Sequence, residues 1–307
     1  MVRVISNVRT QHKNVMEPFN DAWRDGNFLC VEPLVCHQEQ EVLRFLETDP
    51  IGNAIMCGRI RDYGLESYLH RGSFYGCRDQ KGHLKGVALI GHVTLFEARN
   101  RASLIAFARA AQSISVIYSI AGEYRRVDEF WRHFTDGEDQ PHRRTYELML
   151  ERRLPAVIPD CPAELRLATT DDLDLVVEAH ARLTEEELGI KPLESDPSGF
   201  RARCRHRILQ KRVWVWIENN RLLFKADVIS DSPEVTYLEG VYVDIEQRGK
   251  GIGSRCLSCL SHILLSRKSP GGAISVLVNE QHYHAQAFYA KMGFKLHSRY
   301  QRITLQK

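Results

Sequence analysis

Apolar residues in the first half of the chain fall first at helical and then at strand spacing. Residues 37–62 have the helical spacing, and Pro50 divides them into two predicted helices. Short β-rich runs follow, separated by turn residues such as those in "QKGH", and they predict strands at 73–79, 84–91 and 92–98. The remainder of this half predicts a helix, a strand and a helix, at 101–112, 115–121 and 123–134.

The second half repeats this order of elements. The strand "ELRLAT" precedes a helix that Thr169 or Thr170 can cap, and three aspartates favour the first turn of that helix. A further helix and three strands are predicted at 197–210, 213–218, 221–229 and 235–243. The last predicted elements are a helix, a strand and a helix at 252–267, 273–279 and 284–291, followed by a closing strand.

A stretch with three prolines and little periodicity, residues 151–163, predicts a linker between two domains. We therefore expect an N-terminal extension at 1–36, an accessory α/β domain at 37–150 and a second domain at 164–307. The expected fold class is α/β, with a mixed α+β sheet. The shared order of elements slightly favours an internal duplication, but the halves share little sequence, so ordinary similarity between α/β units stays open.

Composition and charge change this picture little. The 307 residues, 43% of them hydrophobic, are enough for two cores or one large core. The formal charge of +3 arises from 42 basic and 39 acidic residues, and the basic stretch at 201–212 is better explained as a solvated helix face than as a nucleic-acid site. No stretch approaches the roughly 18 apolar residues of a membrane span, and the N-terminus lacks a signal-peptide core. We expect a cytoplasmic protein with no membrane partner, and the charge pattern does not favour a nucleic-acid partner.

The eight cysteines are scattered along the chain, which favours a reducing compartment over a disulfide framework. Cys256 and Cys259 form a CxxC pair inside a predicted helix, with no second CxxC and no suitably spaced His pair. We interpret them as small apolar residues on a packed helix face, with a zinc site or a redox pair as the alternatives. No metal is expected.

A glycine-rich stretch, "DIEQRGKGIGSRCLSCL", lies where a predicted strand passes into a predicted helix. The first turn of a helix leaves about four N–H groups unpaired and carries partial positive charge. Glycines let a ligand approach these groups, and Arg248 and Lys250 add positive charge, so the stretch predicts an anion cradle, typically for phosphate. Its spacing is not that of a P-loop, and Gly249 and Gly251 supply only the first half of a dinucleotide fingerprint.

Two sequence motifs, in the same order along the chain as in a known family, give the sequence a resemblance to that family. Arg248, Gly251 and Gly253 form R-x-x-G-x-G after "VYVD", and "NEQHYHAQAFYAKMGF" follows further along the chain. Together they resemble the acetyl-CoA signature of the GNAT N-acetyltransferase superfamily, over about residues 164–306. A narrower similarity, carried by "FLETDPIGNAIMCGRI", "GSFYG", "GVALIG" and "FKADV", is to bacterial proteins in which a poorly characterised N-terminal domain precedes a GNAT domain.

The resemblance implies which residues would bind acetyl-CoA as a cosubstrate. Loop amides would hold the pyrophosphate, and the main chain of the preceding strand would hold the pantetheine arm. The implied cofactor-binding residues are Val241, Tyr242, Val243, Arg248, Gly249, Lys250, Gly251, Ile252, Gly253, Asn279, His282 and Tyr289. His282 departs from the family, which often has an Asn there, so the detail of binding would change. The N-terminal half has "RNRAS" in place of the glycine loop, so a GNAT-like copy there would be a degenerate one without the cradle.

Candidate catalytic residues also follow from the resemblance. Tyr289 matches the family's tyrosine near the CoA sulfur, which implies a general acid, although an aromatic residue packed at a helix end is the alternative. Glu239 lies on the strand that approaches the thioester and is the candidate base. The acidic run 185–187 could shape an amine-binding mouth but is more typical of a solvated face. Lys225 lies in the middle of an apolar strand and is interpreted as facing solvent rather than the site.

The reaction that the resemblance implies is direct transfer of an acetyl group from acetyl-CoA to a primary amine of a small molecule or peptide. A CoA-binding regulatory or scaffold protein with weak or no transfer activity is the alternative, and a nucleic-acid or ribosome-associated modifier is a third. The sequence determines neither the acceptor nor the role of the N-terminal domain, because fold does not fix substrate. It leaves both a monomer and a homodimer open.

Overall fold

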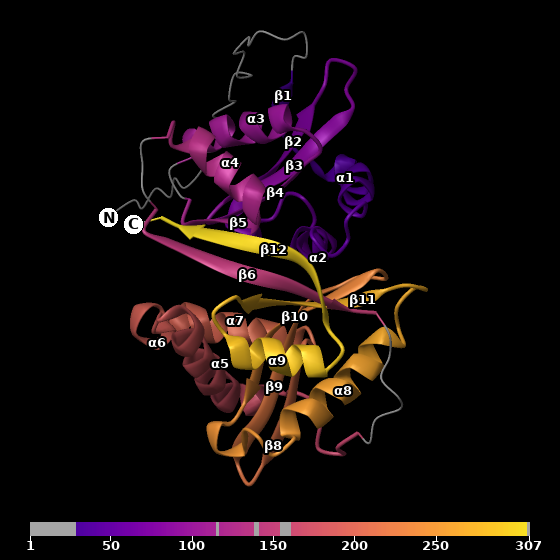
Figure 1. The fold of residues 1–307 in the computed structure, drawn as a ribbon, viewed down its shortest axis with the longest axis vertical. Helices are drawn as coiled ribbons and strands as arrows, with labels where there is room; N and C mark the ends of the chain where they lie inside the picture. Colours follow the sequence, from indigo (N-terminus) through magenta and orange to yellow (C-terminus); the bar gives the residue numbers. More distant parts are fainter. Residues whose placement is uncertain (1–28, 115–116, 138–140, 154–160, 306–307) are drawn as a thin grey trace, which may run out of the picture.

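The computed structural model describes residues 29–114, 117–137, 141–153 and 161–305, and within them one series of elements occurs twice (Figure 1). The first series consists of β1 (Cys30–Pro33), α1 (Glu39–Leu46), α2 (Ala54–Tyr63), β2 (Gly72–Arg78), β3 (Leu84–Gly91), β4 (Val93–Ala98), α3 (Arg101–Gln112), β5 (Ser119–Glu123), α4 (Tyr124–Phe134) and β6 (Arg143–Arg152). The second consists of β7 (Arg166–Leu167), α5 (Leu173–Leu188), α6 (Pro192–Ser195), α7 (Pro197–Leu209), β8 (Val213–Glu218), β9 (Arg221–Asp231), β10 (Val235–Val243), α8 (Ile252–Leu265), β11 (Ala273–Asn279), α9 (Tyr283–Lys291) and β12 (Lys295–Thr304). Apart from the four-residue α6, the two series match element for element.

The mixed α/β fold class is confirmed, and most predicted elements end within a few residues of the observed ones. Two strands were not predicted. β1 lies inside the range expected to be an extension, and β6 continues to Arg152, two residues into the expected linker. β6 has the sequence "RRTYELMLER", whose many charged residues hide the alternation that marks a strand. Most of the predicted extension (1–28) and part of the linker (154–160) lie outside the described residues.

The twelve strands form one sheet, because each series places its last strand against the sheet of the other. β6 pairs with β11, with Leu150 opposite Val276. β12 pairs with β5, with Ile303 opposite Ile120. β6 and β12 also pair with each other over most of their length, and Figure 1 shows them side by side at the centre of the molecule. The two halves are therefore joined by continuous backbone hydrogen bonding and not only by side-chain contact.

Helices cover both faces of the sheet. On one face, α3 and α4 pack on the first half and α8 packs with residues of α9 on the second half. On the other face, α1 and α2 cover the first half and α5 and α7 cover the second. Each helix buries one apolar stripe, as expected for the amphipathic patterns in the sequence. The Thr169 cap is confirmed as a capping box, since Asp172 Oδ2 accepts a hydrogen bond from the Thr169 N–H at 2.7 Å.

Helix α2 crosses from the first half onto the sheet of the second. Ala54 packs in one apolar cluster with Val235 and Tyr237 of β10. Gly58 lies against β9 so closely that a Cβ there would be 2.5 Å from the Ser230 Cβ, so this contact requires glycine. This crossing places α2 next to α7. Arg212, which follows α7, forms a bidentate ion pair with Asp62 of α2, with both N···O distances at 2.6 Å.

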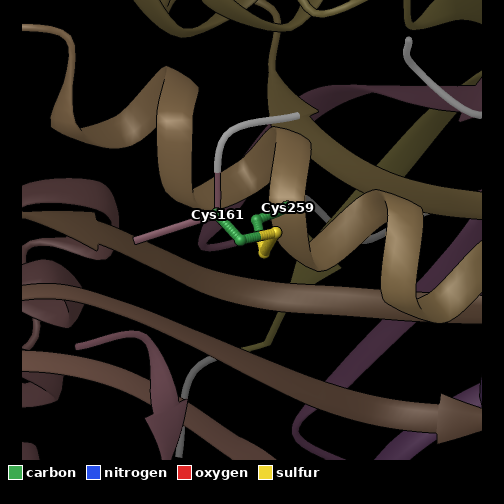
Figure 2. The surroundings of a disulfide bond; sticks show 2 residues. All are labelled: Cys161 and Cys259. Atoms are coloured by element: carbon green, nitrogen blue, oxygen red, sulfur yellow. A yellow bond between two sulfur atoms is a disulfide. The ribbon is translucent and has the colours of Figure 1, made fainter. Parts of the chain in front are cut away.

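The cysteine interpretation needs a correction. Cys259 of α8 forms a disulfide with Cys161, near the start of the second half (Figure 2). Cys256 is free and buried on the same helix, and burial raises the pKa of its thiol to about 12. Cys256 thus fits the predicted apolar role, whereas Cys259 does not. The sequence could not reveal this pair because its members are 98 residues apart.

The strand exchange predicts that the second half cannot fold by itself. A fragment of residues 154–307 lacks β6, which leaves the edge of β11 unpaired and removes both neighbours of β12. We expect this fragment to aggregate or to unfold without a cooperative transition in circular dichroism. Co-expression with residues 1–153 should restore a one-to-one complex. A monomeric 154–307 fragment with a sharp thermal transition would contradict the prediction.

Candidate functional site

The glycine-rich loop leaves the first turn of α8 open. Gly249 and Gly251 have φ values of 78° and 86°, a left-handed conformation that favours glycine, and a Cβ at either position would meet nothing within 4 Å. Gly251 is the N-cap of α8 and supplies no side-chain hydrogen bond to the helix amides. The amides at this helix start can therefore accept a ligand anion without displacing a protein group.

Other loop residues hold the cradle in place. Gly253 has a packing role, because a Cβ there would lie 3.0 Å from Val243 Cγ2, so α8 can approach β10. Arg248 donates a hydrogen bond from Nε to the Val243 carbonyl at 3.2 Å and pairs with Glu186 of α5 at 3.0 Å. The predicted loop residues thus lie together at the end of β10.

Strands β10 and β11 separate beside this loop. They pair in parallel only from Val235 to Leu238, although both strands continue further. A β-bulge lies between Glu239 and Tyr242 where β10 pairs with β9, and Gly240 there has a φ of 59°. Beyond Leu238, β10 stays paired with β9, but its other edge no longer pairs with β11, which leaves main-chain groups available to an extended ligand.

Tyr289 lies on α9, in the apolar cluster that also contains residues of α8, β10 and β11. Its side chain is buried with its ring against Phe288 and Phe294, at centroid distances of 5.3 Å. Burial, with a smaller contribution from the charge of Glu187, raises the pKa of the Tyr289 phenol above its ordinary value. The phenol therefore keeps its proton at neutral pH, as a proton donor must.

Glu239 lies at the start of the β-bulge in β10. Its carboxylate accepts a hydrogen bond from Tyr237 Oη at 2.9 Å. Burial and the Glu239 charge raise the pKa of Tyr237 well above its ordinary value, so this phenol remains a donor. Glu239 is held in one orientation by a neighbour on its own strand.

The Glu187 carboxylate interacts electrostatically with both candidates, Glu239 and Tyr289. Loss of surrounding water, together with the carboxylates of Glu239 and Glu147, raises the pKa of Glu187 to about 7, although the residue as a whole is exposed. Its charge in turn acts on the Tyr289 phenol. The acidic run was expected to be mainly a solvated face, and its last member instead lies close enough to the predicted pair to interact with both.

A buried ionic cluster lies beneath the bulge. Lys225 and Asp227 of β9 are fully buried and pair at 2.8 Å, and Arg207 of α7 pairs with the same carboxylate at 2.8 Å. Burial, with the nearby Lys225 charge, lowers the pKa of His180 to about 3, so this imidazole is neutral. The expectation that Lys225 faces solvent was wrong. Its ammonium group is buried because it pairs with Asp227, two residues further along β9, and the strand pattern alone does not show that Asp227 is buried.

Asn279 and His282 form the turn that leads into α9. Asn279 Oδ1 accepts a hydrogen bond from the Gln281 N–H at 2.8 Å, and His282 occupies the N-cap position without a side-chain cap bond. The Asn279 side chain is thus engaged in shaping the turn. His282 is half-buried at the start of the helix.

The matching cleft of the first half is closed. Its helix α3 is capped by the side chain of Asn100, which accepts a hydrogen bond from the Ser103 N–H at 2.8 Å. Across the gap beside β4, the rings of Phe96 and Phe130 stack at 4.7 Å. Arg126 of α4 pairs with Glu97 of β4 at 2.8 Å. Asn100 thus occupies the helix start of the first half that corresponds to the open one at α8, and the candidate anion site is the one in the second half.

No helix in the described ranges is both long and apolar enough to cross a membrane. Those same ranges contain no group of three or more His, Cys, Asp or Glu residues placed to hold a metal ion.

Comparisons with known proteins agree with this geometry. Residues 210–296, which include the loop and Tyr289, match the family described as the acetyltransferase (GNAT) domain. No curated protein sequence matches the chain. The part of the second half that carries the candidate site is therefore similar in sequence to GNAT acetyltransferase domains.

Several solved structures share the fold of nearly the whole chain. A GCN5-related N-acetyltransferase from Sphaerobacter thermophilus is 13% identical with a TM-score of 0.56, over 91% of this chain and 96% of that one. A Drosophila protein is 12% identical with a TM-score of 0.62, over 90% and 98%. A tandem GNAT protein from the clavulanic acid biosynthesis pathway is 13% identical with a TM-score of 0.52, over 91% and 99%. At these identities the similarity establishes the fold, which is that of a two-domain GNAT protein.

The raised pKa of Glu187 predicts a pH-dependent change in stability. Between its ordinary value of 4.5 and about 7, the folded state binds more protons than the unfolded state, so stability falls as pH rises through this window. Glu187→Gln should therefore leave the thermal midpoint unchanged near pH 4.5 and raise it slightly, by about 1–2 °C, above pH 7. Glu185→Gln, in the same exposed turn, is the control, and an equal gain in both variants would refute the assignment.

Proposed function

We propose that this protein is an N-acetyltransferase that moves the acetyl group of acetyl-CoA directly to a primary amine. The observation that carries the proposal is the uncapped start of α8, with left-handed Gly251, at the end of a strand that has separated from its parallel neighbour. A pyrophosphate fits such amides, and an extended arm with amide groups fits the free edge of β10. The acceptor is proposed to be the amine of a small molecule or peptide.

The proposed cofactor contacts divide between loop and strand. Main-chain groups of Val241, Tyr242 and Val243 would hold the pantetheine arm. Amides around the loop, with the side chains of Arg248 and Lys250, would bind the pyrophosphate; the loop residues are Arg248, Gly249, Lys250, Gly251, Ile252 and Gly253. Asn279 and His282 would lie along the arm at the start of α9.

Acid and base roles are supported by the environments of two residues. Glu239 would take a proton from the incoming ammonium or amine, directly or through water, while Tyr237 keeps the carboxylate oriented. Tyr289 would give its proton to the departing thiolate, because the buried phenol holds its proton at neutral pH. Acetyl-CoA would supply the activated acyl group as a thioester.

A CoA-binding regulatory protein with little transfer activity is the alternative. It needs the cradle but not the acid and base. The Glu187 charge interacts with both Glu239 and Tyr289, which supports grouping the two candidates in one site and favours the enzyme.

Replacement of the cradle glycine tests the cofactor site. Gly251→Val places a side chain in the open space at the helix start and should weaken CoA binding by about tenfold or more in calorimetry. Gly271→Val is the matched control, because Gly271 has a φ of 82° and equally open surroundings but precedes β11 away from the loop. Both variants carry similar backbone strain. Equal CoA affinity in the two variants would show that the phosphate is held elsewhere.

Removal of the phenol tests the proposed acid. Tyr289→Phe should lower kcat for acetyl transfer by about 10²- to 10⁴-fold and leave CoA affinity nearly unchanged, since only the proton donor is lost. Tyr283→Phe, on the exposed side of the same helix, should have no effect. Unaltered turnover in Tyr289→Phe would reject the assignment.

A further inference from the structure

The buried ionic cluster lies directly beneath Gly240, the left-handed glycine of the β10 bulge. A Cβ at Gly240 would lie 2.9 Å from Lys225 Nζ, 3.2 Å from Asp227 Oδ2 and 3.5 Å from His180 Nδ1. Lys225 and Asp227 come from β9, and His180 comes from α5. Polar atoms from two elements thus pack against this glycine, whose φ of 59° also favours glycine.

The Lys225 ammonium joins β9 to the bulge of β10. It pairs with Asp227 Oδ2 at 2.8 Å and donates a hydrogen bond to the Gly240 carbonyl at 3.4 Å. The Lys225 side chain is fully buried, so its charge is balanced by protein groups and not by water. The Gly240 carbonyl is therefore held by a donor that is itself fixed in place by Asp227.

The carbonyl that Lys225 holds belongs to the irregular part of β10. Two residues of β10, Gly240 and Val241, stand opposite the single residue Ala226 of β9. On the other edge, the pairing of β10 with β11 ends at Leu238. Since neither strand ladder fixes the two bulge residues, another contact has to select their conformation, and the Lys225 hydrogen bond is such a contact.

The direction of the Gly240 carbonyl also determines the direction of the next amide. Every peptide bond in the described part of the chain is trans, so the Gly240 C=O and the Val241 N–H point in opposite directions. With its carbonyl held by Lys225, this peptide directs the Val241 N–H away from the buried cluster. The Val241 side chain packs against the apolar cluster to which Tyr289 belongs. Lys225 thus orients an amide of the proposed cofactor strand.

We propose that Lys225 is a positioning residue for the acetyl transfer, and that it acts through the main chain of Gly240. The held peptide follows Glu239, the candidate base, and its N–H is that of Val241, a candidate cofactor-binding residue. This inference rests on the proposed acetyltransferase function. A displacement of about 1 Å in a reacting group can lower a rate about 10²-fold, so a bulge held in one conformation contributes to the rate.

The test compares two variants of the full chain that each remove one cation from the cluster. Lys225→Met keeps an unbranched side chain and loses the charge and the donors. Arg207→Met is the matched control, because Arg207 pairs with the same Asp227 carboxylate at 2.8 Å, and its hydrogen bonds go to Asp227 and His180 and not to Gly240. Each variant leaves the carboxylate with one cation.

Turnover is measured as release of CoA from acetyl-CoA, with lysine, phenethylamine or a peptide with a free N-terminus as the acceptor and water as the background. In Lys225→Met, kcat should fall about 10²-fold while CoA affinity in calorimetry stays within about threefold, because the glycine loop is untouched. Arg207→Met should keep kcat within about tenfold of the wild-type value. Lys225→Arg should restore part of the rate, because a cation with donors remains at the position.

Hydrogen exchange followed by mass spectrometry tests the same role without turnover. Peptides that span residues 238–243 should exchange faster in Lys225→Met than in the wild-type protein or in Arg207→Met, because the bulge has lost the bond that holds it. Thermal midpoints show whether each variant is folded. Should Lys225→Met not fold, Lys225→Gln replaces it in both measurements, since its side chain is uncharged but still polar.

Two results would overturn the inference. One is a kcat for Lys225→Met that is no lower than that of Arg207→Met, which would show that Lys225 only balances the Asp227 charge. The other is unchanged exchange of the 238–243 peptides in Lys225→Met, and this result counts whether or not any amine is acetylated. Failure of the proposed function would appear separately, as wild-type protein that does not bind CoA or does not turn over any of the acceptors.

Discussion

The exchange of β6 and β12 is the constraint on which the rest of the structure depends. Backbone hydrogen bonds leave little freedom in the relative placement of two paired strands, and here they fix one half of the chain to the other across the centre of a twelve-stranded sheet. Because the halves cannot shift, α2 of the first half can lie on β9 and β10 of the second with a glycine contact. This contact places α2 beside β10, the strand that carries Glu239.

The two halves share a topology but differ where a ligand would bind. In the second half, a left-handed glycine leaves the helix amides of α8 open and the neighbouring strands separate beside them. In the first half, Asn100 caps the matching helix, and Phe96, Phe130 and an ion pair fill the matching gap. A small number of side chains thus decides whether this fold offers a cradle. Helix α2 of the first half instead packs against β9 and β10, the strands that lead to the candidate site of the second half.

The sequence predicted local features well because their physical causes are local. The spacing of apolar residues indicated nearly all helices and strands, and the glycine loop indicated an anion cradle at a helix start. The sequence did not predict β6, because charged residues interrupt the apolar alternation of that strand. The sequence also placed Lys225 in solvent, because nothing in the pattern shows that its partner Asp227 is buried. The disulfide between Cys161 and Cys259 was invisible for a similar reason, since residues 98 apart reveal no pairing until the chain folds.

Spacing and residue type alone determined the order of elements, the glycine loop and the tyrosine at the end of α9, because these depend on neighbours within a few residues. Only the tertiary structure decided which charges meet. The carboxylates of Glu239 from β10 and Glu147 from β6 act on Glu187 of α5, and Asp227 of β9 pairs with both Lys225 and Arg207 of α7. Electrostatic energies depend on distance and on the exclusion of water, and a sequence specifies neither until strand exchange has brought its two halves together.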